Sequence, residues 1–537
     1  GDAEKVHLCL NAGADVNWTN EAESKNTPLH MAATNGHADC VRLLLAAPGS
    51  DVNRANENGE TPLNMAAARG HEECVNLLLA APGSDVNKAN ENGETPLIIA
   101  SKQGHTECVR TLLTAPGIDV NKANMSGNTP LALAATNGHT ECVRTLLAAP
   151  GIEVNSEDKD SQTPLHWAEN NNHTECADLI RAAGGKSRRA AILLEQMGIS
   201  PEQYNSSLYA AVRDRETEKI SLLLAAGADA NWANEDENGT TPLVLAAQKG
   251  HTECVRLLLA APGIDVNKAN KDGTTPLSWA AQKGHTENVN LLLAAPGINI
   301  NQVDSKGITP LFWAASWNHT ECVRLLLAAP GIDINLADTT GLTPFICAAG
   351  HGHTECVSLL LNAPGIDVNQ TSQKGNTALC LATYYNRTEC VNLLLNTPGI
   401  DVNMGIPNGD TPLMIAACNG HTECLRLLLS APGIDVNKAE KNGITPLICA
   451  AAMNQTECVR ILLNEPKLDV NKANRDGDTP LFWAASRGHT ECVRTLLAAP
   501  RINVNKANKN NTTPLSAATA NGHTECANLI RAAGGRR

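Results

Sequence analysis

The sequence has few aromatic residues. Phe, Tyr and Trp make up 3% of the 537 residues, with only three Phe and four Tyr. Globular domains usually fill their cores with such large side chains, so we do not expect the three or four compact domains that this length would otherwise suggest. The hydrophobic fraction of 42% is nevertheless too high for a disordered chain. The core must therefore be thin and filled mainly by Leu, Ala, Val, Ile and Cys.

Other absences exclude classes of partner. Basic residues are outnumbered, with 42 Lys and Arg against 56 Asp and Glu and a net charge of −14, which weighs against nucleic acid or anionic lipid as the main partner. No apolar run approaches the ~18 residues of a membrane span. The chain begins at Gly1 without an initiator Met or a signal-peptide segment, so we expect it to be a fragment.

A 34-residue repeat organises the chain. Thr-Pro-Leu or a close variant recurs in this register, and the position of its proline occurs fourteen times: Pro28, Pro62, Pro96, Pro130, Pro164, Pro242, Pro276, Pro310, Pro344, Ala378, Pro412, Pro446, Pro480 and Pro514. Self-similarity at a fixed period of this length is the signature of stacked repeats.

Each unit reads as two short helices followed by an extended finger. In one copy, Thr61 suits an N-cap and Pro62 the first helical position. Gly70, whose position is otherwise taken only by Asn, suits a left-handed helix end. A second helix with an apolar face follows and stops at Pro82-Gly83. Neither helix is long enough to stand alone, so neighbouring copies must bury each other's faces.

The phrase G-x-T-P-L-x-x-A-A-x-x-G-H-x-E-C-V-x-L-L-L closely resembles the ankyrin repeat, and the likeness covers most of the chain. The family's unit, which is about 33 residues long, usually ends G-A-D-V-N, and A-P-G-I-D-V-N is one longer here. The resemblance implies an all-α repeat fold, an ankyrin solenoid of helix-turn-helix-finger units. It also implies a non-enzymatic protein that binds other proteins through its concave helix surface and finger tips.

Two arrays share their starting and ending signatures. Residues 1–32 match 215–246, and 175–185 match 525–535. Terminal repeats are atypical because one face meets solvent, so these segments are interpreted as caps.

We therefore predict a first array over 1–185, which starts within a repeat and holds about five full repeats. The second, over 206–537, holds about nine full repeats after an N-terminal cap repeat. The junction 186–205 is predicted to contain a short extra helix around residues 190–194, and it acts as either a hinge or a rigid adaptor. The second array opens with a helix near Leu208, and we expect a similar helix to be encoded before Gly1.

Cysteine and histidine resemble metal ligands but have structural explanations. Thirteen of the 18 Cys, from Cys40 to Cys526, share one repeat position, mostly within His-x-x-Cys phrases. In the family this position is a buried aliphatic residue, and Cys is buried just as readily. Successive copies are too far apart for a disulfide, and a zinc site needs four converging ligands. We predict no metal, no cofactor and a reducing compartment, which favours the cytoplasm.

Histidine follows the same repeat, since twelve of the 16 lie in the turn after the first helix. The resemblance implies that these residues tie turns together through hydrogen bonds. His30 and His166 belong to the family's TPLH variant. The remaining two, His7 and His351, lie outside the repeat pattern, and neither has a Ser or Cys in a recognised nucleophile motif. No catalytic residue is therefore predicted, and His7 is expected to face solvent.

Departures from the repeat at exposed positions are the informative residues. In the middle of the second array, apolar or aromatic residues take three positions that are polar in most copies. The candidate partner-binding residues are Ile308, Trp317, Leu336, Leu342, His351, Tyr384, Tyr385 and Met404. A contiguous exposed patch of this kind marks an interaction site. The alternative is drift, with the aromatic rings packing onto adjacent turns.

The sequence thus predicts a monomeric scaffold that binds other proteins, and neither nucleic acid nor membrane. Two alternatives stay open. The chain is an interaction segment of a larger protein whose effector or catalytic domain lies beyond these termini, or it is a mechanical spacer.

Overall fold

The computed structural model describes residues 1–536, which form 32 α-helices, two short 3-10 helices and no β-strand. The helices alternate between a first and a second helix in each repeat, and a finger loop connects one repeat to the next. No helix within this part of the chain is long and apolar enough to cross a membrane. The predicted all-α repeat architecture is confirmed.

Fourteen first helices begin at the repeated proline or, once, at Ala378: α2 (Pro28–Thr34), α4 (Pro62–Arg69), α6 (Pro96–Gln103), α8 (Pro130–Thr136), α10 (Pro164–Asn170), α15 (Pro242–Lys249), α17 (Pro276–Lys283), α19 (Pro310–Ser316), α21 (Pro344–His351), α23 (Ala378–Tyr384), α25 (Pro412–Asn419), α27 (Pro446–Ala452), α29 (Pro480–Ser486) and α31 (Pro514–Ala520). A further first helix, α13 (Tyr204–Asp214), begins without this proline.

Thirteen second helices carry the cysteine ladder: α3 (Ala38–Ala46), α5 (Glu72–Ala80), α7 (Thr106–Leu113), α9 (Thr140–Leu147), α11 (Thr174–Ala182), α16 (Thr252–Leu259), α20 (Thr320–Ala328), α22 (Thr354–Leu361), α24 (Thr388–Leu395), α26 (Thr422–Ser430), α28 (Thr456–Leu463), α30 (Thr490–Leu497) and α32 (Thr524–Ala532). Three second helices lack the ladder cysteine: α1 (Ala3–Asn11), α14 (Thr217–Ala226) and α18 (Thr286–Leu293). Outside the repeat lie α12 (Arg188–Gln196), η1 (Pro201–Gln203) and η2 (Glu235–Glu237).

Local capping fixes where each first helix starts and stops. The Thr61 hydroxyl accepts the N–H of Asn64 at 3.2 Å, with Pro62 at the first helical position. Gly70 ends the helix at φ 74°, and Asn172 takes the equivalent left-handed position at φ 59°. Asn tolerates positive φ better than most residues. The left-handed helix end that was predicted from the exchange of Gly for Asn at this position is therefore confirmed.

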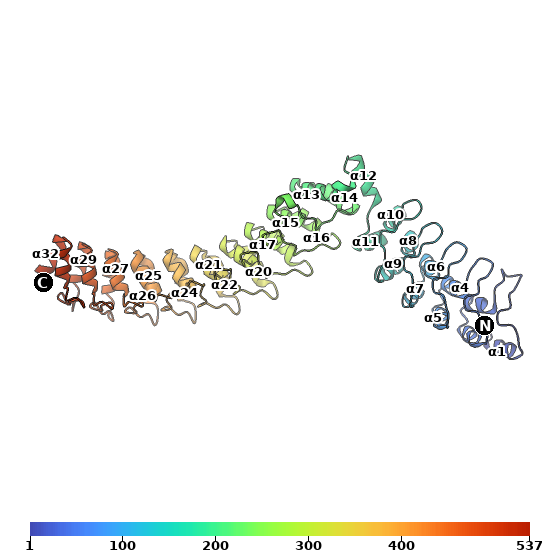
Figure 1. Cartoon of the computed structure of the whole chain (residues 1–537), viewed down its shortest axis with the longest axis horizontal. Coiled ribbons are helices and arrows are strands. Elements are labelled where there is room, and N and C mark those ends of the chain that lie inside the picture. The colour runs from blue at the N-terminus through green and yellow to red at the C-terminus, as the bar shows by residue number, and fades with distance from the viewer. Residues whose placement is uncertain (537) are drawn as a thin grey trace. The chain divides into compact units, whose positions relative to one another are not determined.

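Stacking of the repeats builds the interior. From α2 to α10 and from α15 to α31, the first helices pack against the first helices of adjacent copies and against their own second helices, as the row α25, α27 and α29 shows (Figure 1). Cys74, Val75 and Leu78 on α5 are buried between neighbouring second helices. Within the first unit, the buried apolar residues from Val16 to Ile180 therefore form one continuous core.

Hydrogen bonds tie the fingers to one another. The side-chain amide of Asn53 donates to the Gly83 carbonyl at 2.6 Å, and its oxygen accepts the N–H of Asp85 at 2.9 Å. The same pair of bonds recurs along the chain, for example from Asn403 to Gly433 and Asp435. Each of these fingers is thus hydrogen-bonded to the finger of the next repeat, and we call this series of bonds the finger ladder.

The chain divides into two compact units. The first comprises Gly1–Trp232 with Ala260–Ile264, and the second comprises Ala233–Leu259 and the chain from Asp265 onward. The predicted extra helix is confirmed as α12, which packs against α14 within the first unit. The division into arrays with matching signatures, and the choice between hinge and adaptor, stay predictions.

His30 is a buried histidine whose two ring nitrogens are both engaged. Its Nδ1 accepts the N–H of Thr27 at 3.2 Å, so its Nε2 carries the proton and donates to the Glu60 carbonyl at 2.9 Å. Burial lowers the pKa of His30 below its ordinary value of 6.5, although the bond to Glu60 opposes this. Asn64 makes the equivalent contacts one copy later, to Thr61 and Glu94.

We expect this histidine to make stability depend on pH. Below pH 6.5 the unfolded chain binds a proton at His30 that the folded chain does not, so the free energy of unfolding falls until the lowered pKa is reached. The variant His30→Asn, which copies Asn64, should lose less, by at most about 1.4 kcal/mol per pH unit. Hydrogen exchange of α2 above and below pH 6.5 measures this, and an equal pH dependence in both proteins would contradict it.

Candidate functional site

The second unit has a pocket between α23 and α25, which we call the tyrosine pocket. It has a volume of about 340 Å³, and its lining includes Tyr384, Tyr385, Ile406, Asp410, Met414 and Cys418. Two neighbouring first helices supply its sides, and the finger before α25 supplies its third wall. Ligand sites usually span ~300–1,000 Å³, so a cavity at the lower end of this range suits one large side chain better than a metabolite.

The two tyrosines stand at the end of α23. Tyr384 is its last residue and Tyr385 its cap, and their rings meet edge to face with centroids 5.0 Å apart. A histidine of the next repeat fixes the turn after α23, because the Nε2 of His421 lies 3.1 Å from the Tyr384 carbonyl oxygen. Both side chains are more than half exposed, at 54% and 53%. The backbone is therefore fixed while the rings remain available for contact.

Ile406 breaks a pattern that every comparable finger keeps. At this position the other copies have a polar side chain that accepts N–H groups of its own turn, as Asn90 accepts those of Asn92 and Glu94 at 3.0 and 2.9 Å. The equivalents with such a bond are Asn56, Asn124, Asp158, Asn270, Asp304, Asp338, Ser372, Glu440, Asn474 and Asn508. Ile406 cannot accept a hydrogen bond and instead lines the pocket half-buried.

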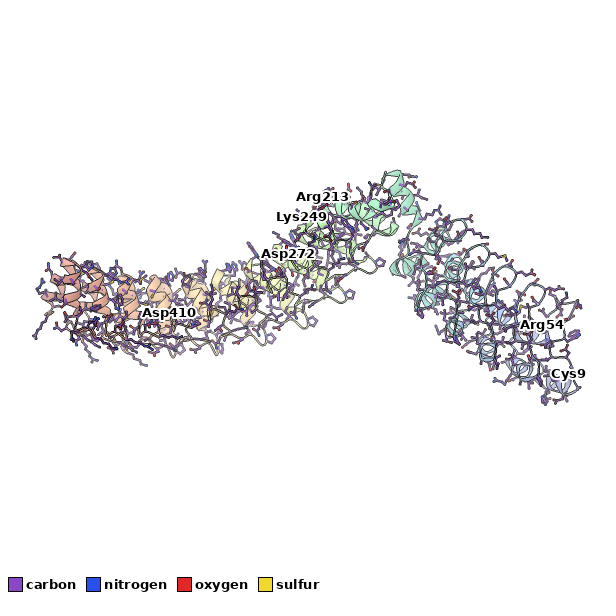
Figure 2. The ribbon with its side chains drawn as sticks, in the orientation of Figure 1. Cys9, Arg54, Arg213, Lys249, Asp272 and Asp410 are labelled. Atoms are coloured by element: carbon purple, nitrogen blue, oxygen red, sulfur yellow. The ribbon has the colours of Figure 1, made fainter. Side chains whose placement is uncertain are left out.

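Asp410, labelled in Figure 2, is one of the residues that line this pocket. One carboxylate oxygen accepts from the Asn408 amide at 2.5 Å. None of the ion pairs between side chains of residues 1–536 involves Asp410. The pocket therefore combines an aromatic and aliphatic lining with one negative charge that no basic side chain of the described chain neutralises.

The predicted site residues do not all meet in this pocket. Trp317 is 59% exposed at the end of α19. It shares its repeat position with His351 and Tyr385, so the three lie in a row one repeat apart. His351 hydrogen-bonds its own helix at the Cys347 carbonyl, 2.9 Å away, and its ring stacks on that of His353. Of the predicted residues, only Tyr384 and Tyr385 line the pocket.

The prediction that Ile308 is exposed was wrong. Ile308 is 8% exposed and forms a small cluster with Phe312 and Cys347, against which Trp313 and the half-buried Leu342 pack. The large side chains on α19 reach the corner between helix and finger, so an apolar residue after the turn glycine is covered there. Ile308 and Leu342 are thus held by internal packing.

The finger position of Leu336 and Met404 has a structural role in other copies. Lys88 donates from its Nζ to the carbonyl of Asn53 in the preceding finger at 2.7 Å, and Gln302 keeps the equivalent bond, to Asn267, at 3.3 Å. Leu336 and Met404 cannot donate such a bond, and both are half-buried. Gln302 therefore keeps the hydrogen bond between neighbouring fingers, whereas Leu336 and Met404 remove it.

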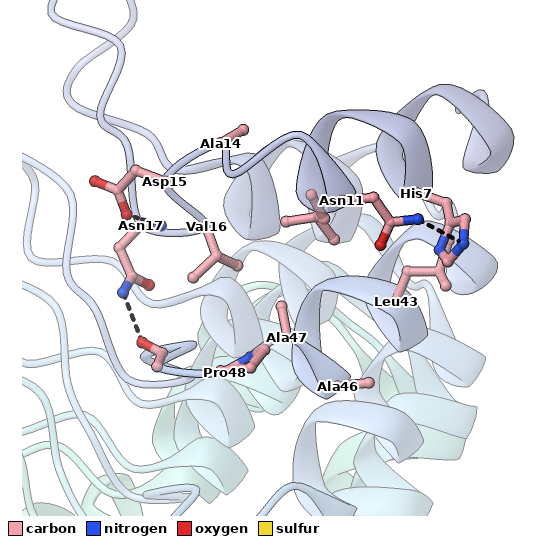
Figure 3. Close-up of a pocket in the computed structure, with 12 residues that line it drawn as sticks. His7, Asn11, Ala14, Asp15, Val16, Asn17, Leu43, Ala46, Ala47 and Pro48 are labelled. Atoms are coloured by element: carbon pink, nitrogen blue, oxygen red, sulfur yellow. Dashed lines mark hydrogen bonds between the residues drawn. The ribbon is translucent and has the colours of Figure 1, made fainter.

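A second pocket lies at the N-terminal end of the first unit (Figure 3), with a volume of about 560 Å³. His7 is exposed there, as expected, and its Nε2 lies 3.0 Å from the amide nitrogen of Asn11 on the same helix. On the opposite side Asn17 donates to the Gly49 carbonyl at 2.7 Å, which is the ordinary finger bond. This pocket is a gap between the first two repeats whose polar contacts are those of the scaffold.

The ladder cysteines and the turn histidines have structural roles in the repeats. The thirteen ladder cysteines are buried, and burial raises the pKa of the Cys108 and Cys458 thiols to about 11. In nine turns the histidine Nε2 lies near the carbonyl of the preceding copy, as His105 does at 3.1 Å from Ala68. Within residues 1–536, no three His, Cys, Asp or Glu side chains are grouped to hold a metal ion.

A model of a known protein family matches the chain in overlapping segments from residue 1 to residue 535. The family model described as "Ankyrin repeats (3 copies)" matches residues 1–90, 79–158, 121–191, 179–270, 207–304, 262–338, 330–406, 398–474 and 467–535. Repeats of this family generally mediate protein–protein interactions and are typically not catalytic.

Similar curated proteins share short stretches with this chain. The Arf-GAP with coiled-coil, ANK repeat and PH domain-containing protein 2 of Rattus norvegicus is 34% identical over 84 residues, which is 16% of this chain and 10% of that protein. Histone-lysine N-methyltransferase EHMT1 of Mus musculus is 40% identical over 58 residues, 11% and 4% of the two chains. Cortactin-binding protein 2 of Oryctolagus cuniculus is 46% identical over 59 residues, 11% and 3%.

The chain thus spans a tenth or less of the length of these relatives. The family model, in contrast, covers it from residue 1 to residue 535. With the stacked two-helix repeats and the finger ladder, this coverage establishes that the chain belongs to the ankyrin repeat family.

Proposed function

We propose that this chain is a non-enzymatic scaffold that holds a partner protein at the tyrosine pocket. The partner inserts one large apolar side chain between Tyr384, Tyr385 and Ile406. Stacked repeats on both sides hold the pocket walls in place, so little conformational entropy is lost on binding. Aromatic residues around a small pocket are typical of the few contacts that dominate binding energy.

The observation that carries this proposal is the isoleucine at position 406. Eleven other fingers use that position for a hydrogen bond that stabilises their own turn. Among these twelve fingers of residues 1–536, that bond is replaced by an apolar surface only here, next to the two exposed tyrosines. A local loss of stability at a surface is typical of a position that serves binding.

The charge of the pocket favours a basic flank on the partner. Asp410 is the acidic residue at the pocket, and the chain as a whole carries a net charge of −14. A Lys or Arg beside the apolar anchor would pair with this carboxylate, and attraction to the acidic chain would speed its approach. We therefore propose a peptide segment with an aromatic or large aliphatic residue next to a basic one.

A second candidate function is that this chain is the interaction segment of a larger protein and binds a partner through the same surface. The names of the similar proteins combine ANK repeats with coiled-coil and PH domains, or describe a methyltransferase, and the matched stretches are small parts of them. We further propose that the chain is monomeric and works in a reducing compartment such as the cytoplasm, which its many buried, isolated thiols favour.

Restoring the polar finger residue tests the proposal. A random peptide library is selected on the full chain, and the best peptide is titrated against native protein and Ile406→Asn. We expect the asparagine to raise the free energy of unfolding by about 1 kcal/mol through the turn bonds it gains. It should weaken the peptide about tenfold or more by removing an apolar wall.

The converse change is the matched control. Asn474→Ile removes the same turn bonds from a finger outside the pocket, so it should lower stability and leave affinity unchanged. Equal affinity of native and Ile406→Asn protein would overturn the proposal.

A further inference from the structure

One pair of thiols stands apart from the cysteine ladder. Cys418 in α25 and Cys449 in α27 are half-buried, whereas the ladder cysteines are buried. The two helices pack side by side, and the two thiols are hydrogen-bonded to each other. Cys418 also lines the tyrosine pocket, so a small molecule can reach it from solvent.

The register of the repeats brings this pair together. The spacing along the chain from Cys418 to Cys449 equals the spacing from Gly350 to Leu381 two repeats earlier. A Cβ placed on Gly350 would lie 3.4 Å from the Cβ of Leu381. Because the Cβ atoms of a disulfide lie about 3.5–4.5 Å apart, two cysteines in this register are within reach of a covalent bond.

A third copy of this register shows the same contact. Ser316 and Cys347 have the same spacing, and their side chains are hydrogen-bonded. The contact is therefore a regular feature of neighbouring first helices, and residues 418 and 449 are the place where both members are cysteine.

We propose that Cys418 and Cys449 are a redox modification site, a dithiol that hydrogen peroxide oxidises to a disulfide joining two adjacent repeats. This site is independent of the proposed partner. Ladder cysteines do not qualify, because each is buried and the side-chain hydrogen bonds of ladder thiols are to hydroxyl or amide oxygens, as between Thr106 and Cys142 at 3.4 Å and between Asn386 and Cys424 at 3.3 Å.

Cys418 supplies the nucleophile. The S–H of Cys449 donates to its sulfur, which lowers the pKa of the Cys418 thiol below its ordinary value of 9.0 and raises the pKa of Cys449. The Cys418 thiolate attacks one peroxide oxygen, the O–O bond breaks, and hydroxide leaves to give a sulfenic acid. The Cys449 sulfur then attacks the Cys418 sulfur, forming the S–S bond and expelling a second hydroxide.

The reaction balances without a further reactant. The two thiol protons convert both hydroxides to water, and the two electrons that the sulfurs lose reduce the peroxide. The product ties α25 to α27 and moves a sulfur that lines the tyrosine pocket.

Peptide mass spectrometry of the full chain tests this site. The protein is treated with hydrogen peroxide, alkylated and digested with trypsin without reduction. We expect a linked pair of peptides 388–426 and 442–460 that has lost two hydrogen masses, with fragmentation placing the bond at Cys418 and Cys449. Dithiothreitol should release it. Absence of this linked pair in the native chain would overturn the proposal.

The repeat supplies variants that should fold. Cys418→Ser copies Ser316 and Cys449→Ala copies Ala517 at equivalent positions, and each should abolish the link. Cys424→Ser, which removes a buried ladder thiol from the same peptide, should leave it intact. Ser316→Cys should create a second link, to Cys347. A link that survives in Cys418→Ser, or one that forms only at the engineered pair, would contradict the assignment.

Discussion

Replacing Phe345 by alanine is expected to lower the free energy of unfolding by about 3–5 kcal/mol. Phe345 is fully buried in α21, at a position that holds Leu in the thirteen other copies. It lies inside the second unit, with α19 on one side and α23 on the other, so the cavity would loosen two interfaces at once. In a stacked array stability resides in such nearest-neighbour interfaces.

Urea unfolding and hydrogen exchange measure this loss, and exchange should rise first in α19, α21 and α23. Phe345→Leu, which restores the residue of the other copies, should cost less than about 1.5 kcal/mol. Met453→Ala removes an apolar side chain that is 53% exposed and should cost close to nothing. A Phe345→Ala variant no less stable than Phe345→Leu would show that neighbouring copies do not depend on this layer.

The repeat itself explains why the fold could be predicted. Fourteen copies show the same cap at Thr61 and its equivalents, and the exchange of Gly70 for Asn172 or Asn318 reports a backbone angle directly. The extra helix α12 was also predictable, because its apolar residues interrupt the repeat between two recognisable ends. The helix starts and ends could be predicted because each depends on local capping preferences, and the same residues recur at these positions in fourteen copies.

Burial at individual positions was harder to predict because it depends on particular neighbours. Ile308 lies at a position that is polar in most other copies, yet Phe312 on the following helix covers it. Tyr384 and Tyr385 were identifiable as breaks in the repeat, and they are exposed. The break at Ile406 was equally visible in sequence as the loss of a polar residue before the turn glycine.

The thiol pair needed the three-dimensional register. The spacing of Cys418 and Cys449 along the chain matches no motif and falls short of the 34-residue period. Only the packing of α25 against α27 shows that these two positions face each other.

Removing both rings with Tyr384→Ala and Tyr385→Ala together should cost most of the partner's binding energy. Each ring is an exposed wall of one small pocket, so neither contributes to the buried core of the repeat. Truncating residues of this kind at the centre of an interface typically costs about 2–4 kcal/mol, or about 30-fold to 1,000-fold in Kd. The backbone bond from His421 to Tyr384 persists after truncation, so the fold should be retained.

The most direct test is therefore a fluorescence titration of the selected, labelled peptide against the native chain, the double tyrosine variant and Trp317→Ala. Trp317 is a matched control because it is as exposed as the tyrosines and lies outside the pocket. A scaffold that binds through the tyrosine pocket predicts a loss of at least about 30-fold for the double variant. It also predicts native affinity for Trp317→Ala and unchanged helical circular dichroism for both. Native affinity in the double variant would contradict it.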